Sequence, residues 1–171
     1  HYLKKTNHRG QALLVHKLEV DESGIMIFAK DEEAKFNLQK NWKELIINHT
    51  FVGLVEGDVQ EESGLNISWI DEETGKLNFS NNLETAPRDP VKAITRFRTI
   101  KKANGLSMLE FDPREDRNNK IRVQMAEMGH PILGDKKYGE FISPLKRFAL
   151  HAFLIRFRHP VTKELMKFEI S

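Results

Sequence analysis

The chain contains no cysteine among its 171 residues, and it has only two tryptophans and two tyrosines. The lack of cysteine excludes disulfides, thiolate metal sites and a cysteine nucleophile, and it fits a reducing compartment, for which we expect the cytoplasm. No apolar run approaches the roughly 18 residues that a membrane helix needs, so we expect no membrane partner. We expect no hydrophobic leader, and residues 1–171 contain no internal repeat or low-complexity tract, which favours one globular domain.

The two halves of the chain differ in charge. Residues 1–85 hold 9 Lys and Arg against 15 Asp and Glu, a balance of −6, whereas residues 86–171 hold 18 against 10, a balance of +8. Such a separation is typical of a basic face that neutralises phosphates, and equally of a chance excess of solvated lysines. Charge alone leaves both interpretations open.

Short apolar runs rich in β-forming residues predict most of the secondary structure. The predicted strands are residues 12–15, 25–29, 51–55, 93–100, 106–111, 149–157 and 165–170. Asn104-Gly105 predicts a tight hairpin turn, and His159–Thr162 predicts the turn of a terminal hairpin. Between residues 58 and 90 we expect short strands and mobile loops, with turns at Ser63-Gly64, Thr74-Gly75 and Asn81-Asn82.

Two helices are predicted among these strands. Asp31 is a good N-cap for a helix that reaches about Leu45, with Ala34, Leu38, Trp42 and Leu45 forming one apolar stripe. Asn118 or Asn119 can cap a second helix that runs to Met128 and stops at Gly129. Strand pairs with a few inserted helices predict an α+β fold built on a mostly antiparallel mixed sheet.

Four segments carry residue patterns of a more specific kind. They are His16-Lys17-Leu18-Glu19-Val20-Asp21-Glu22-Ser23-Gly24; Phe51-Val52-Gly53-Leu54-Val55-Glu56-Gly57; Ala93-Ile94-Thr95-Arg96-Phe97 with Arg117–Val123, Gly129–Asp135 and Tyr138-Gly139; and Leu150-His151-Ala152 with Phe157–Thr162. Taken in this order, they resemble the motifs of the A-type (RluA-like) RNA pseudouridine synthase catalytic domain. Those motifs include His-Arg-Leu-Asp-x-Asp-Thr-Ser-Gly, Tyr-x-Ala-Leu-Val-x-Gly, Arg-Thr-His-Gln-Ile-Arg-Val-His and Gly-His-Pro-Ile-x-Gly-Asp-x-x-Tyr-Gly.

This resemblance implies the pseudouridine synthase fold and an RNA isomerase that needs no metal or cofactor. A uridine is flipped out of its stack, an Asp carboxylate drives breakage of the glycosidic bond, and the uracil rejoins the sugar through carbon. An aromatic ring stacks on the base and an Arg pairs with the Asp. The family's opening strands have no counterpart here, so we expect a single catalytic domain that is the C-terminal part of a longer natural protein.

Three catalytic roles transfer to this sequence with two changes. Arg122 keeps the arginine, Phe51 replaces the stacking Tyr, and Glu19 replaces the Asp. The extra methylene of Glu19 moves its oxygens by about 1–1.5 Å, and a misplacement of that size can cost on the order of 10²-fold in rate. Simple alternatives remain: an inherited ion pair between Glu19 and Arg122, and core packing for Phe51.

Basic residues in or next to the matched segments predict contacts with RNA phosphates. They are Lys17, Arg96, Arg98, Arg117, Lys120, Lys136 and Lys137. The sequence thus predicts a monomeric enzyme that converts uridine to pseudouridine in structured ribosomal or transfer RNA. The alternatives are an inactive RNA-binding relative that acts in RNA folding or ribosome assembly, and a partner-binding domain without an RNA role.

Overall fold

The computed structural model describes residues 12–70, 77–78, 91–113, 120–139 and 147–170. The chain divides into a terminal unit, His1–His49 with Ala152–Ser171, and a central unit, Thr50–His151. Strands β4 (Ile46–Glu56) and β9 (Leu150–Arg158) contribute residues to both units. Antiparallel pairing dominates and the helices are few, which confirms the predicted α+β class.

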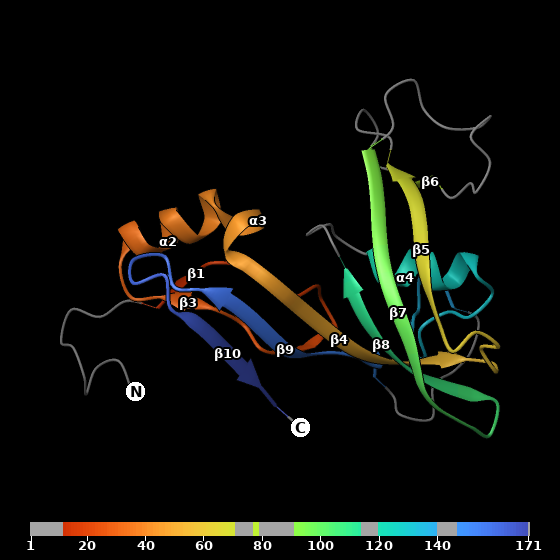
Figure 1. Ribbon diagram of the computed structural model, residues 1–171. Coiled ribbons are helices and arrows are strands. Elements are labelled where there is room, and N and C mark those ends of the chain that lie inside the picture. Colours follow the sequence, from red (N-terminus) through yellow and green to blue (C-terminus); the bar gives the residue numbers. More distant parts are fainter. Residues whose placement is uncertain (1–11, 71–76, 79–90, 114–119, 140–146, 171) are drawn as a thin grey trace. The chain divides into compact units, whose positions relative to one another are not determined.

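The terminal unit combines two short helices with several short strands (Figure 1). Its elements are β1 (Leu13–Leu14), β2 (Ser23–Gly24), β3 (Phe28–Ala29), α2 (Glu32–Lys40), α3 (Trp42–Leu45) and β10 (Leu165–Glu169). Strand β1 pairs with β3, while β2 and β10 both pair with β9. The core of this unit consists of Val15, Ala29, Leu38, Leu45, Ile155 and Phe157.

The predicted helix after Asp31 forms, but it is divided in two. The Asp31 side chain accepts a hydrogen bond of 2.7 Å from the Ala34 amide, which confirms the N-cap. Helix α2 ends at Lys40 because the backbone of Asn41 leaves the helical conformation, with a φ of −107° and a ψ of 24°. The Asn41 side-chain amide caps this end by donating to the Asn37 carbonyl at 3.1 Å. Prediction of one continuous helix was wrong at this residue.

The central unit is an antiparallel sheet with one helix against it (Figure 1). Its strands follow the order β4-β8-β7-β5-β6, where β5 is Ser63–Ile70, β6 is Leu77–Asn78, β7 is Val91–Ala103 and β8 is Leu106–Pro113. Helix α4 (Lys120–Glu127) packs on β5 and ends shortly before Gly129, as predicted. Its predicted caps, Asn118 and Asn119, lie outside the described residues.

The alternation predicted for β7 is confirmed by burial. Thr95 and Phe97 are 1% and 3% exposed, whereas Arg96 and Arg98 lie exposed on the opposite face. The hairpin turn to β8 is also confirmed, because Asn104 and Gly105 have φ values of 55° and 70°, as a type I′ turn requires. Local sequence signals were sufficient for both features.

The expectation of short strands after residue 58 was wrong for β5, which is eight residues long. Ser63-Gly64 is the start of this strand and not a turn. Gly64 pairs with Phe97 on β7, and a Cβ atom on Gly64 would lie 2.7 Å from the Phe97 ring, so the glycine leaves room for that ring. The other two predicted turns, at Thr74-Gly75 and Asn81-Asn82, lie outside the described residues.

Among the described residues, no helix has the length and apolar character needed to cross a membrane.

Candidate active site

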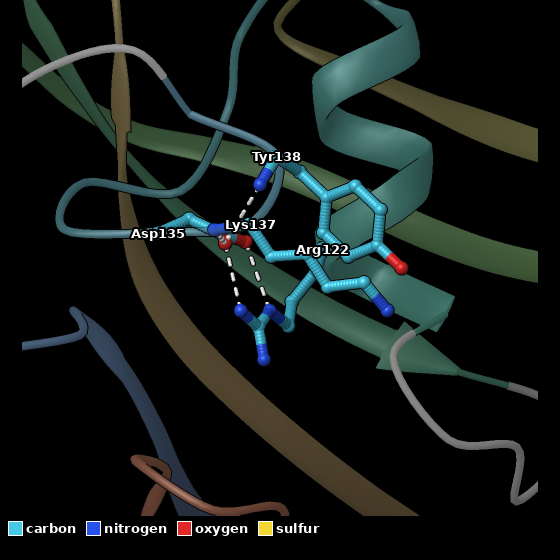
Figure 2. A network of polar contacts seen from close by, with 4 residues as sticks. All are labelled: Arg122, Asp135, Lys137 and Tyr138. Atoms are coloured by element: carbon cyan, nitrogen blue, oxygen red, sulfur yellow. Dashed lines mark hydrogen bonds and ion pairs between the residues drawn. The ribbon is translucent and has the colours of Figure 1, made fainter.

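Arg122 and Asp135 form a two-pronged ion pair in the central unit, which Figure 2 shows from close by. Arg122 Nε donates to Asp135 Oδ2 at 2.8 Å, and Arg122 Nη2 donates to Oδ1 at 2.7 Å. The Asp135 side chain is fully buried and that of Arg122 is 11% exposed. Two parallel charge-assisted bonds fix the plane of the guanidinium as well as its position.

The loop after α4 is built around the Asp135 carboxylate (Figure 2). Oδ1 also accepts hydrogen bonds from the backbone amides of Lys137 and Tyr138, at 2.9 and 3.0 Å. The Gly139 amide donates to the Asp135 carbonyl at 3.0 Å, and a Cβ atom on Gly139 would lie 2.8 Å from that oxygen. The Gly-Asp-x-x-Tyr-Gly motif therefore encodes a turn whose backbone amides bond to the Asp carboxylate. The last residue must be glycine, because a side chain there would collide with the Asp135 carbonyl.

Asp135 is held in its ionised form. Burial alone raises the pKa of its carboxyl, but the hydrogen bonds from Arg122, Lys137 and Tyr138 and the charge of Arg122 outweigh burial, so the pKa lies below its usual value. The pair is therefore a carboxylate facing a guanidinium throughout the neutral range.

Two aromatic rings lie against the Arg122 guanidinium. Its carbon is 4.6 Å from the centroid of the Phe148 ring and 5.6 Å from that of Tyr138. These cation–π contacts add to the hold of the two-pronged ion pair with Asp135, which we call the fork. They form because a planar guanidinium packs well on an aromatic face. The Lys137 ammonium lies 4.8 Å from the Tyr138 ring centroid.

Strand β4 fixes the start of the loop. The Glu56 amide donates to the Pro131 carbonyl at 3.0 Å, and the Leu133 amide donates to the Leu54 carbonyl at 2.8 Å. The His130 ring nitrogen Nδ1 donates to the Glu56 carbonyl at 2.8 Å, so this histidine also ties the loop to the strand. Asp135 is thus carried by a segment that is bonded to the central sheet.

Helix α4 is joined to the sheet by buried polar groups. Gln124, 2% exposed, donates to Ser68 Oγ at 2.8 Å. Lys120 is also 2% exposed, and its ammonium donates to the Ile94 carbonyl at 3.0 Å. This burial argues against the predicted phosphate contact of Lys120, because the ammonium points into the protein and not toward solvent. Lys120 is therefore omitted from the RNA interface proposed below.

Phe51 lies on β4 in the central unit and is 7% exposed. It pairs with Phe111 on β8, which in turn pairs with Phe97 on β7, so three aromatic residues occupy one register row across the sheet. This row is consistent with core packing, and also with a ring that is packed against its neighbours on one side and stacks on a base with the other. The stacking role of Phe51 therefore stays a prediction.

Glu19 lies half-buried in a loop of the terminal unit. Its backbone amide donates to Glu22 Oε2 at 2.9 Å, and the Glu22 amide donates to the Glu19 carbonyl at 3.1 Å, with Asp21 between them at a φ of 82°. Gly24 ends the loop, where a Cβ atom would lie 2.2 Å from the Ala152 carbonyl oxygen. Glu22 stands where the family signature has Thr, and sequence reasoning missed its role in shaping this loop.

The other predicted cations are distributed over both units. Lys17 is exposed beside Glu19 in the terminal unit; Arg96, Lys136 and Lys137 are exposed in the central unit. Arg98 is exposed and forms an ion pair of 3.0 Å with Glu110, while Arg117 lies outside the described residues. The predicted pairing of Glu19 with Arg122 joins residues of different units and stays a prediction. No cluster of three or more His, Asp or Glu that could hold a metal occurs in the described ranges.

Comparison with known proteins decides the family. The family described as RNA pseudouridylate synthase matches residues 1–127. The chain belongs to the RNA pseudouridylate synthase family. The RNA pseudouridine synthase YjbO of Bacillus subtilis is 31% identical over 168 residues, covering 98% of this chain and 58% of that protein. The dual-specificity RNA pseudouridine synthase RluA of Haemophilus ducreyi is 29% identical, covering 93% and 73% of the two chains.

Similarity to RluA-type enzymes confirms the resemblance noted in the sequence. The RNA pseudouridine synthase YhcT of Bacillus subtilis is 30% identical over 89% of this chain and 50% of its own length. The chain thus spans about half the length of several curated relatives. The solved structure of human RNA pseudouridylate synthase domain containing 1 superposes with a TM-score of 0.75 at 21% identity, over 99% of this chain and 71% of that one, which confirms the fold.

Proposed function

We propose that this protein isomerises uridine to pseudouridine in structured RNA. The observation that carries the proposal is Arg122, the arginine that the family motif requires, held rigidly by Asp135 and two aromatic rings. Proteins that are similar to nearly the whole chain are named RNA pseudouridine synthases. This favours an active enzyme over an RNA-binding protein without catalytic activity.

The reaction is an isomerisation, in which one bond between base and sugar replaces another and the atomic composition of the nucleoside does not change. The bond between uracil N1 and ribose C1′ breaks, a bond between C5 and C1′ forms, C5 loses its hydrogen to solvent and N1 gains a proton. We assign the carboxylate of Glu19 to the bond-breaking step, by attack on the sugar or by proton abstraction. Arg122 orients that carboxylate, and Phe51 stacks on the flipped base.

Exposed cations of both units form the RNA interface in this proposal. They are Lys17, Arg96, Arg98, Lys136 and Lys137, with Arg117 added from the sequence alone. Contacts of this kind position the phosphate backbone without reading the base sequence. We further propose that the protein works as a monomer in the cytoplasm, without metal or cofactor, as the C-terminal catalytic part of a longer natural protein.

Ribosomal and transfer RNA are the substrates that we propose. A similar protein of Haemophilus influenzae is named ribosomal large subunit pseudouridine synthase C, and the RluA relatives are named dual-specificity enzymes. A direct test incubates the purified protein with total ribosomal and transfer RNA and separates the digested nucleosides by chromatography. We expect pseudouridine with the natural protein and none with Glu19→Ala.

An RNA-binding protein without activity gives a different pattern. It produces no pseudouridine with either protein, while its RNA affinity falls steeply as salt rises. Glu19→Asp tests the reach of the carboxylate, since Asp is the family's residue. If shortening the side chain by one methylene does not raise the rate, side-chain length is not what limits the reaction.

A further inference from the structure

We propose that Asp135 is a positioning residue for the isomerisation, because it sets the orientation of Arg122 before RNA binds. This inference rests on the proposed function of Arg122 and extends it to a residue for which no role has been assigned. Arg122 is the only member of the pair that has a predicted catalytic contact, so Asp135 acts through it.

The first argument is the geometry of the fork. A guanidinium has three nitrogens in one plane, and Asp135 engages two of them, Nε and Nη2, at 2.8 and 2.7 Å. With that edge fixed, the direction in which Nη1 points is also fixed. An arginine held by a single bond could still rotate about it, whereas two parallel bonds prevent this rotation.

The second argument is that Asp135 is itself immobilised. Its side chain is fully buried, and Oδ1 accepts two backbone amides in addition to Nη2. The backbone of the same loop is bonded to β4 through Pro131 and Leu133. Hydrogen bonds therefore connect Arg122 through Asp135 and its loop to the central sheet. The orientation of Arg122 is fixed by this sheet and not by a mobile surface group.

The third argument concerns charge. Asp135 already compensates the positive charge of Arg122, so a second carboxylate that approaches this arginine meets a group whose charge is largely neutralised. The contribution of Arg122 to catalysis is then mostly directional, because Asp135 fixes the direction in which the remaining guanidinium donors point. Loss of Asp135 should affect turnover more than RNA affinity.

The test compares Asp135→Asn with the natural protein. An asparagine has the same shape and can still accept the Lys137 and Tyr138 amides through Oδ1, but it presents an NH₂ group to an Arg122 donor. We expect kcat to fall by about 10- to 100-fold while KM for RNA changes less than about threefold, as for a misplaced catalytic group. Glu169→Gln is the matched control, since it removes an exposed ion pair with Lys167 at 2.6 Å and should leave kcat unchanged.

A second measurement separates positioning from a merely structural role. In an Arg122→Lys background the fork cannot form, so Asp135→Asn should lower kcat less than threefold further. Equal losses in both backgrounds, or an unchanged kcat in the single variant, would overturn the proposal. Where Arg122→Lys has no measurable turnover, the division between kcat and KM in the single variant decides.

The third measurement does not depend on activity. The Nε–H signal of Arg122 in a nitrogen-15 NMR spectrum should exchange slowly with water in the natural protein and rapidly in Asp135→Asn. Rapid exchange of the Arg122 Nε–H in both proteins would show that the fork between Arg122 and Asp135 does not form in solution, which overturns the proposal. Slow exchange in a protein that makes no pseudouridine refutes the proposed function and leaves the fork standing as a structural element only.

Discussion

Acidification below pH 6.5 should destabilise the protein through His49. Burial and, secondly, the charge of His16 lower the pKa of His49 from 6.5 to about 4. The ring centroids of the two histidines are 5.2 Å apart, and His16 lies 4.8 Å from the ring of Trp42 in the same unit. Protonation of His49 thus places a charge in a half-buried aromatic cluster.

The sign and size of the effect follow from linkage. The unfolded chain takes up the proton near pH 6.5 and the folded chain only near pH 4, so stability is complete above pH 6.5 and falls as the pH drops between these values. The difference, 6.5 minus 4, corresponds to a loss of about 3 kcal/mol in the free energy of unfolding, as an upper value. The pKa of Asp135 lies below 3.8, so its own contribution is lost only at more acid pH.

Urea unfolding at a series of pH values measures this loss. Trp42 fluorescence follows the transition in a Trp69→Phe background, because Trp42 lies beside His16. His49→Gln should remove most of the slope between pH 6.5 and 4.5 without removing the slope below pH 4. A stability that stays constant from pH 7 to 4.5, or an equal slope in His49→Gln, would refute the reasoning.

Three further predictions concern the candidate site. Phe51→Ala should lower the free energy of unfolding by about 3–5 kcal/mol in urea denaturation, because the ring is buried in the aromatic row of the central sheet, and it should also abolish turnover. Lys136→Gln with Lys137→Gln should weaken binding to all RNA sequences alike and reduce the slope of log affinity against log salt by about 2, as seen in a filter-binding titration. Glu22→Ala removes the acceptor for the Glu19 amide, so kcat should fall while unfolding in urea changes by only about 1 kcal/mol; an unchanged kcat would show that this bond does not position Glu19.

Features set by neighbouring residues in the sequence were predictable. Asp31 caps its helix and Asn104-Gly105 turns its hairpin because both signals depend on one or two residues and their own backbone angles. The alternation of β7 was equally clear, since one face meets the core and the other meets solvent. The order of the four motif segments along the chain was sufficient to identify the family.

Features that depend on distant partners were not predictable in the same way. Gly64 reads as a turn residue until Phe97 is placed across from it, and Lys120 reads as a phosphate contact until its ammonium is found at the Ile94 carbonyl. Asp135 carried no role in the sequence because the Arg122 fork joins a helix to a loop 13 residues later. Only the fold brings these groups together.

The most direct measurement of the proposed chemistry is tritium release from RNA that carries tritium at C5 of uridine. Isomerisation must expel the C5 hydrogen, so the natural protein should release tritium to water in proportion to the pseudouridine formed. Glu19→Ala should release none, and Asp135→Asn should release it slowly. If the natural protein binds the labelled ribosomal and transfer RNA and releases no tritium, Glu19 does not act as the catalytic carboxylate and the protein is not an active pseudouridine synthase on these RNAs.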